Sequence, residues 1–293
     1  MRPPRQGGAL LLMVALLLAT LAALAFGMNR AGSVELRSIN DDYEGRAAAY
    51  LAEAGVAAAR WSSQINDCKD ASYQNEAFGA GTFTVTATQN SGRLTIRTAS
   101  GKFNGAVRTL ETPEFRIFNL AKAERVDIDD DAKDTTIAKG SPTRQEKENL
   151  RLVSGQSHIL MSWKLDDIDD DMRVLSATLT LVQAAVGGAP RRVAVHRVTT
   201  GWDEGATWTR PRPGVAWDGG TYNGAVLATA SVPAAGTASW NVTGLLDSWA
   251  GKRVPAQGLL LRLLDAGQAA TFYSNEATDS RRPLLRVVAA EKC

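Results

Sequence analysis

Histidine and cysteine are both scarce in this sequence, with two of each among 293 residues. His158 and His196 lie in stretches that are typical of β-strands, and no serine or cysteine motif of a hydrolase accompanies them. Cys68 and Cys293 are too few for a disulfide scaffold, and neither has a second cysteine or a histidine at the spacing of a zinc site. We therefore expect no enzymatic activity and no cofactor other than the candidate calcium ion considered below.

A surplus of charge of either sign is also missing. Lys and Arg total 33 against 31 Asp and Glu, which gives a net charge of +2. Such a balance creates no field strong enough to attract nucleic acid, so we expect no nucleic-acid partner. The length is sufficient for a membrane segment and two modest folded domains.

Charged residues are absent from Ala9 to Phe26, a run of eighteen mostly apolar residues. This length is close to the roughly 20 residues that span a bilayer as a helix, and it exceeds the core of a secretion signal. Arg2 and Arg5 precede the run, so the positive-inside rule keeps the N-terminus in the cytoplasm. The alternative is an ordinary signal peptide, because Ala23-Leu24-Ala25 matches a signal peptidase site.

Apolar and small residues continue beyond this run at intervals of three or four, which predicts that one helix extends to about Trp61. Charged residues fill much of the remaining positions, so the second half of the helix is amphipathic while the first half is apolar all round. An export signal has no use for such an extension. The stripe consists of Leu36, Ile39, Tyr43, Ala47, Tyr50, Leu51, Ala54, Ala58 and Trp61.

Through RQGGALLLMVALLLA and AAAYLAEAGVAAARW, this helix resembles the N-terminal region of type IV pilus minor pilins of the PilX type. The resemblance implies that prepilin peptidase cuts after Gly8 and leaves Ala9 as the mature N-terminus, with Gly7 as the alternative cleavage position. It also implies that the partners are other pilins and the pilus assembly machinery. Such a helix anchors in the membrane and later packs in a fibre.

Met13 stands at the fifth mature position, where major pilins carry a glutamate. That carboxylate would pair with the α-amine of a neighbouring subunit in apolar surroundings, and an unpaired buried charge costs several kcal/mol. A subunit that lacks the acid therefore suits a tip or sparse position.

Residues 79–112 alternate apolar and polar side chains, with Phe83, Val85 and Ala87 on one face and threonines on the other. Turn residues at 89–92 and 100–102 divide this stretch into three short antiparallel strands. We therefore predict a small pilin-like domain, in which the long helix packs on this sheet, ending near residue 115.

From about Ile117, short β-type stretches alternate with clusters of Gly, Pro and Asp, which is typical of an all-β sandwich with a jelly-roll layout. From Arg125 to Ala289 the chain resembles DNRLRE (disaggregatase-related) domains, through ILMSWKLDDI, VHRVTTGWDEGATW and FYSNEATDSRRPLLRV among other stretches. That family implies a β-sandwich that binds polysaccharide rather than cutting it. The expected strands are HILMSWKL, VLSATLTLV, RRVAVHRV, AVLATASV, TASWNV, QGLLLRLL and RPLLRVVA, and LLDSWAG is expected to form a short helical turn.

The predicted fold class is α+β: a long N-terminal pilin helix packed on a small antiparallel sheet, followed by an all-β jelly-roll-like sandwich. The predicted location is the inner membrane, crossed once, with an extracytoplasmic C-terminus that later reaches a pilus or the cell surface. The predicted parts are a leader peptide (1–8), the transmembrane part of the pilin helix (9–28), the remainder of the pilin-like domain (29–115) and the DNRLRE-type sandwich (116–293).

Two acidic runs, 127–134 and 166–171, supply the oxygen ligands that calcium prefers. A helix-loop-helix calcium loop fails in the first run, where Ala132 replaces the required glycine and Ala138 the bidentate glutamate. An irregular calcium site between strands and a solvated acidic turn remain as alternatives. The candidate calcium ligands are Asp127, Asp129, Asp131 and Asp134.

Trp217 lies among Gly and Asp residues in an expected loop, so we predict an exposed ring that contacts a glycan. Four other tryptophans are expected in the core, since they lie in strand, helix or framework-like positions: Trp202, Trp208, Trp240 and Trp249.

Cys68 and Cys293 both lie on the exported side, where an oxidising compartment permits a disulfide. An intramolecular bond would tie the end of the sandwich to the end of the long helix. Free thiols and an intermolecular bond are the alternatives.

The resulting functional hypothesis is a minor pilin-like component of a type IV pilus or related assembly, which anchors and presents a β-sandwich for adhesion or polysaccharide binding. One alternative is a membrane-tethered carbohydrate-binding protein with no pilus role. A more remote alternative is a glycan-degrading enzyme, which would need positioned acid and base groups in a cleft.

Overall fold

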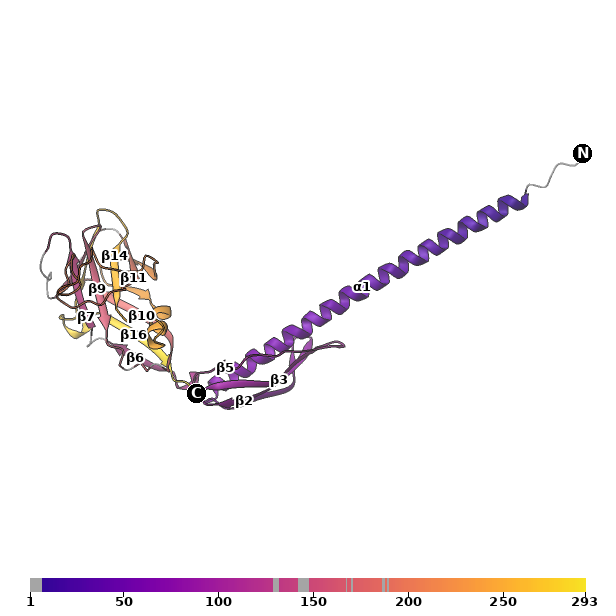
Figure 1. Ribbon diagram of the computed structural model, residues 1–293, viewed down its shortest axis with the longest axis horizontal. Coiled ribbons are helices and arrows are strands. Elements are labelled where there is room, and N and C mark those ends of the chain that lie inside the picture. The colour runs from indigo at the N-terminus through magenta and orange to yellow at the C-terminus, as the bar shows by residue number, and fades with distance from the viewer. Residues whose placement is uncertain are drawn as a thin grey trace, which may run out of the picture. The chain divides into compact units, whose positions relative to one another are not determined.

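The computed structural model describes residues 7–293 except 129–131, 142–147, 167, 170, 186–187 and 189. The side chains of residues 7–15, 27, 29–36 and 279 also lie outside the described part. The described chain is a β-rich α+β protein with antiparallel sheets (Figure 1). It divides into two compact units, one comprising residues 1–63 and 69–116, the other residues 64–68 and 117–293. The predicted border after residue 115 lies next to this division.

The first unit is built on helix α1 (Gly7–Ile65), which is 59 residues long. Strands β2 and β3 lie along its C-terminal half (Figure 1). The sheet order is β1-β2-β3-β4, with β5 beside β3, and all pairings are antiparallel. The strands are β1 (Ala71–Phe78), β2 (Gly81–Asn90), β3 (Arg93–Phe103), β4 (Ala106–Thr109) and β5 (Phe115–Arg116).

Helix and sheet meet through small and apolar side chains. The helix buries Ala48, Leu51, Ala52, Val56 and Ala59, which recur at helical spacing on one face. The sheet presents Phe83, Val85 and Ala87, the three residues that the sequence places on one face of β2, and all are buried. Burial of an apolar face, rather than helix propensity, supplies most of the stability of such a contact.

One of the predicted turns in this sheet, at residues 100–102, is wrong. The sequence predicts a turn at 100–102, but β3 runs through these residues to Phe103. A Cβ atom on Gly101 would lie 2.0 Å from the backbone oxygen of Ala48 in α1, so the glycine permits close packing instead of a turn. The turn lies at Asn104–Gly105, where Asn104 adopts a φ of 49°. Strand β1, which is polar and mostly exposed, was not predicted.

Several large apolar side chains in the N-terminal half of α1 are exposed. Leu17, Leu21 and Leu24 are 60–64% exposed, Phe26 is 70% exposed and Met28 is 76% exposed. Among the described residues, no helical stretch is both long and apolar enough to cross a membrane. The predicted transmembrane part, 9–28, includes side chains outside the described part.

The second unit contains two antiparallel sheets, and all seven strands predicted from its sequence are present. Strands β6, β7, β8 and β15 were not predicted. The four-stranded sheet has the order β13-β10-β16-β6, made of β13 (Thr237–Asn241), β10 (Arg173–Val182), β16 (Leu284–Ala290) and β6 (Glu124–Ile128). The seven-stranded sheet has the order β12-β11-β14-β9-β8-β15, with β7 paired to β9. Its strands are β7 (Ala132–Ala138), β8 (Asn149–Val153), β9 (Ser157–Trp163), β11 (Arg191–Arg197), β12 (Ala228–Val232), β14 (Leu259–Leu263) and β15 (Ala269–Tyr273).

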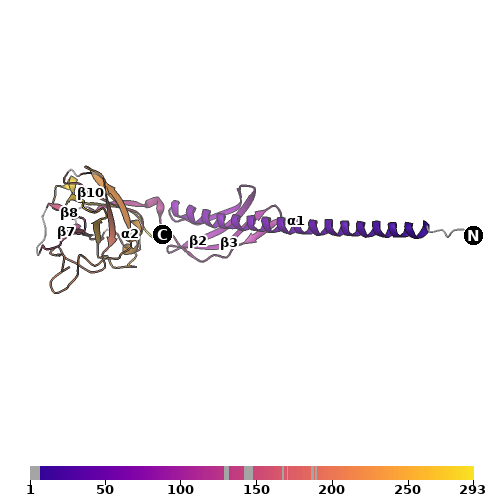
Figure 2. The same ribbon diagram turned by 90° about the horizontal axis from the view of Figure 1, so that it is seen from above.

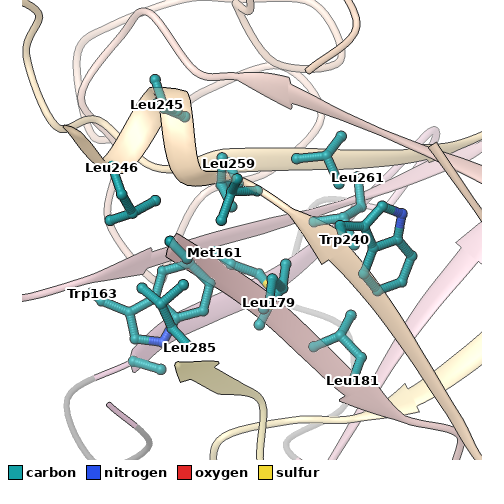
Figure 3. Packing of buried hydrophobic residues seen from close by; sticks show 14 of the residues in the cluster. Met161, Trp163, Leu179, Leu181, Trp240, Leu245, Leu246, Leu259, Leu261 and Leu285 are labelled. Atoms are coloured by element: carbon teal, nitrogen blue, oxygen red, sulfur yellow. The ribbon is translucent and has the colours of Figure 1, made fainter. Parts of the chain in front are cut away.

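The two sheets share one hydrophobic core, as in a β-sandwich. Figure 3 shows Leu179 and Leu181 of β10 and Leu285 of β16 together with Met161 of β9 and Leu261 of β14. Buried residues alternate with less buried ones along most of β10, which is the pattern expected of a sandwich core, whereas β14 is buried at four of its five positions.

Trp240 is held in this core by a polar anchor as well as by packing. Its ring is 1% exposed and meets Phe272 edge-on at 6.3 Å, while its Nε1 donates a hydrogen bond to Val193 O at 2.9 Å. A buried indole needs such a partner, because an unpaired donor costs free energy. Helix α2 (Thr243–Ala250), the predicted short helix, packs against β10 and buries Leu246 and Trp249. Its place in the second unit can be followed in Figure 2. The core positions predicted for Trp240 and Trp249 are confirmed.

A disulfide joins Cys68 to Cys293 within the second unit, with Cα atoms 5.5 Å apart. Further bonds surround it: Cys293 N donates to Ile117 O at 3.2 Å, and Phe118 N donates to Gln64 Oε1 at 3.2 Å. Of the alternatives open from the sequence, the structure therefore has the intramolecular bond. It ties the turn that follows α1 to the last residue of the chain.

Candidate functional site

The segment 198–227, which connects β11 to β12, covers the outer face of the seven-stranded sheet. Ile137, Leu160 and Leu260 of the sheet form a second hydrophobic cluster with Val198, Ala206 and Trp217 of this segment. Leu160 and Leu260 lie opposite each other in the register of β9 and β14, so both point to the same face. The covering segment also carries Trp202, Trp208 and Tyr222, which pack against the cluster at its edge.

Trp217 is buried in this cluster, so its predicted exposure is wrong. The side chain is 9% exposed, and its Nε1 donates to Thr207 O at 2.7 Å. The sequence suggested a loop, which is correct, but the loop folds back onto an apolar sheet face and turns Trp217 inward. The ring is therefore not available for a glycan contact in this structure.

Trp202, which was expected in the core, is half-buried: it packs at the edge of this cluster and also lines a cavity of about 210 Å³ on the second unit. Lys133 and Ser162 lie opposite each other in the register of β7 and β9, so both side chains belong to the outer face of the sheet. Lys164 follows the end of β9, and Gln257 precedes β14. We call this site, lined by Lys133, Ser162, Trp163, Lys164, Trp202, Ala256 and Gln257, the Trp202 cavity.

The Trp202 ring is fixed in position by its own hydrogen bond. Nε1 donates to Gln257 O at 2.9 Å, and the side chain is half-buried. An aromatic face beside a hydroxyl, an amide and two ammonium groups matches the chemistry of a sugar, whose ring has an apolar face and a rim of hydroxyls. The volume lies below the roughly 300–1,000 Å³ of clefts that enclose a whole small molecule, so it suits one ring of a longer chain.

Trp208 is likewise half-buried rather than fully in the core. Its Nε1 donates to Asp218 Oδ1 at 2.6 Å, and Lys139 Nζ lies 5.2 Å from its ring centroid. The ring of His158 packs against it at a centroid distance of 5.0 Å. Trp208 thus fastens the covering segment to the sheet.

Both histidines hold the covering segment in place. Nδ1 of His158 donates to Gly219 O at 2.7 Å, and Nδ1 of His196 lies 3.1 Å from both Asn223 O and Ala225 O. Burial lowers the pKa of both side chains, and the positive charge of Arg262 lowers it further. Lys139 acts in the same direction on His158. The folded protein therefore keeps these histidines neutral where an unfolded chain would protonate them.

The second unit is expected to lose stability as the pH falls below 6.5, the ordinary pKa of histidine. Above that pH the histidines are neutral in both the folded and the unfolded protein. Below it they become protonated in the unfolded chain but stay neutral in the folded protein, which favours unfolding. Each histidine contributes at most about 1.4 kcal/mol per pH unit. Denaturant unfolding between pH 7 and pH 5 measures the slope.

Replacing His158 and His196 with asparagine keeps a donor near the position of Nδ1 and removes the titration. We expect this double variant to flatten the dependence in the same pH window. The aspartates with depressed pKa values, Asp127 and Asp265, lose their stabilising effect only at lower pH and leave this window unchanged. An equally steep loss in the double variant would contradict the assignment.

The four candidate calcium ligands do not gather into a described site. Asp129 and Asp131 lie outside the described residues. Both oxygens of Asp127 accept from Arg286, at 2.9 and 3.1 Å, and the two arginines Arg286 and Arg125 lower the pKa of its carboxyl group. Asp127 is thus an ion-pair partner between β6 and β16.

Asp134 is buried in β7, and its Oδ2 accepts from Asn275 N at 2.7 Å. Over the described residues, no three His, Cys, Asp or Glu side chains are placed to hold a metal ion together. The calcium hypothesis therefore gains no support from Asp127 or Asp134. Gly8 and Ala9, the predicted processing residues, lie in the first turns of α1, and their surroundings are outside the described part.

No protein-family model matches the chain, and no curated protein sequence matches it.

Proposed function

We propose that this protein is a minor pilin-like component of a type IV pilus or a related assembly. In this proposal the N-terminal half of α1 first anchors in the inner membrane and then packs among neighbouring pilin helices. The second unit, a DNRLRE-type sandwich of jelly-roll layout, faces the exterior and binds polysaccharide. Prepilin peptidase, other pilins and the assembly machinery are the expected protein partners.

One observation carries the first part of the proposal: the described apolar side chains of α1 between Leu16 and Met28 are exposed, while the C-terminal half of the helix packs on a sheet. Leu16, Leu17, Leu18 and Leu21 are each at least 60% exposed. Soluble monomers rarely expose contiguous apolar patches of this kind, so such a surface marks contact with lipid or with another apolar surface. A bilayer and a bundle of helices would each cover it.

The Trp202 cavity supports the second part, because its ring face and donors can hold a sugar ring. The proposal places the glycan contact at Trp202 in place of Trp217. Most glycosidases break the glycosidic bond with a pair of carboxylates, whereas the described lining of the Trp202 cavity consists of aromatic, hydroxyl, amide and ammonium groups, so we propose binding rather than cleavage.

Replacing Trp202 with alanine is expected to weaken polysaccharide binding roughly ten- to a hundredfold, since a central aromatic anchor contributes about 1.4–2.8 kcal/mol. Binding of the full chain, solubilised in detergent, to a glycan array and then to the best polysaccharide by calorimetry measures this loss. Trp61→Ala is the control, because Trp61 belongs to the first unit, is exposed and does not line the cavity. Equal losses in the two variants would place the contact elsewhere.

The mature N-terminus is expected to be Ala9. N-terminal sequencing of the membrane-associated protein distinguishes the possibilities: Ala9 supports prepilin peptidase, whereas Phe26 indicates an ordinary signal peptidase and removes the apolar part of α1. Gly8→Leu should abolish processing, and Gly7→Leu should leave it in place. If processing stops only in the Gly7 variant, the cut follows Gly7 instead.

Pull-down with this chain separates the pilus proposal from a membrane-tethered binding protein without a fibre role. Recovery of pilins supports the former. Glycan binding with no pilin recovered, from cells that assemble pili, would favour the latter.

A further inference from the structure

Two more cavities lie beside the Trp202 cavity on the second unit. The first, which we call the Trp249 cavity, measures about 410 Å³ and is lined by Leu165, Asp166, Trp249, Lys252 and Pro255 among others. The second, the Arg197 cavity, measures about 290 Å³ and is lined by Arg197, Asn223, Leu227, Asn241 and Ser248 among others. All three open along the short connection between α2 and β14.

Shared lining residues show that the three cavities form a row. Ala256 belongs to both the Trp202 cavity and the Trp249 cavity. Val254 belongs to both the Trp249 cavity and the Arg197 cavity. The order is therefore Trp202, Trp249, Arg197, with the residues 254–256 as the common wall.

The sheet register explains why the row lies at one end of the sandwich. Leu259, the first residue of β14, pairs with Met161 near the end of β9 and with Arg197 at the end of β11. Met161 in turn pairs with Asp134 near the start of β7, next to Lys133. Four neighbouring strands therefore begin or end at the same level, and the residues beyond them line the cavities.

Each cavity in the row combines polar or charged groups with apolar wall residues. The outer cavities supply donors, from Lys133 and Lys164 at one side and from Arg197 and Asn223 at the other. The middle cavity has apolar walls together with the charged groups of Asp166 and Lys252.

We infer that the three cavities are consecutive subsites for one linear polysaccharide chain, with one sugar ring in each. This inference rests on the proposed polysaccharide binding and adds to it the location, the path and the minimum length of the bound stretch. A ligand that fills one cavity gains one set of contacts, whereas linked rings gain the next sets without a second loss of translational freedom. The site therefore selects chains of at least three rings.

The test titrates the full chain with ladders of one to six linked sugars. Three probes cover neutral, N-acetylated and acidic chemistry: cello-oligosaccharides, chito-oligosaccharides and oligogalacturonates. For the ladder that binds, affinity is expected to rise about tenfold with each added ring up to three and then to level off. Trp202→Ala and Arg197→Ala should each reduce the affinity for the three-ring ligand to that of a two-ring ligand.

Arg192→Ala is the matched control, because Arg192 lies on the same strand as Arg197 but pairs with Asp265 and lines none of the three cavities. Thermal unfolding of each variant confirms that the sandwich is intact. Binding that does not depend on length, or an Arg197 variant that behaves like the Arg192 control, overturns the row of subsites while leaving polysaccharide binding in place. Absence of binding to every ladder overturns the polysaccharide proposal and this inference together.

Discussion

Replacing both Cys68 and Cys293 with serine is expected to lower the free energy of unfolding of the second unit by about 5 kcal/mol. The two residues are 225 positions apart, so the bond closes a very long loop, and the loss of that constraint increases the entropy of the unfolded chain. No large side chain is removed, which leaves the core between the sheets unchanged. The effect is comparable to the whole stability of a marginal domain.

Denaturant unfolding followed by tryptophan fluorescence measures this loss. Six of the seven tryptophans belong to the second unit, and Trp61 alone lies in the first. The wild-type chain treated with a reductant serves as the control and should unfold at the same denaturant concentration as the double variant. A midpoint unchanged by either treatment would show that the bond contributes nothing to stability.

The same variant should loosen the end of α1. Asp67 and Cys68 both adopt left-handed backbone conformations, with φ of 52° and 60°, which non-glycine residues rarely do. The disulfide and the hydrogen bond from Phe118 N to Gln64 Oε1 hold this turn on the second unit. Without the disulfide we expect faster amide hydrogen exchange at residues 64–68 and 117–119 than in the core strands.

Gly101→Ala is expected to destabilise the first unit by roughly 3 kcal/mol, at the upper end of the usual cost of overpacking. The new Cβ would lie 2.0 Å from Ala48 O and 2.5 Å from Ala52 N. Both atoms belong to the backbone of α1, so no side chain can rotate away and the helix must move off the sheet. In the proposed function, the C-terminal half of α1 would then lose part of its packing on the sheet.

Gly105→Ala is the matched control, since a Cβ at Gly105 meets no atom within 4 Å. Hydrogen exchange of β3 and of the C-terminal half of α1 reports the difference between the variants. Protection should fall in the Gly101 variant and remain in the Gly105 variant. Similar protection in both variants would contradict the prediction, because it would mean that the helix and the sheet can accommodate a Cβ atom at residue 101.

Local periodicity was sufficient to predict the elements that carry their own pattern. The helical stripe that includes Leu51 and the alternation of Phe83, Val85 and Ala87 are properties of neighbouring residues, and the faces they predict are the buried ones. Seven strands of the second unit were predicted for the same reason. Strand β1 was not predicted. It is mostly polar and exposed, so its sequence lacks the alternation of apolar and polar residues that marks a strand with one buried face.

Contacts between distant segments decided the rest. Gly101 could serve either in a turn or in a close contact with the backbone of Ala48. The choice depends on a helix some fifty positions earlier in the chain, so the local sequence cannot predict it. The sequence by itself determined that only Cys68 and Cys293 could pair, but their bond required the chain's last residue to reach the turn after α1. In the same way Trp217 and Trp202 lie in one connecting segment, and only the folding of that segment over an apolar sheet face buries the first ring and places the second at a cavity.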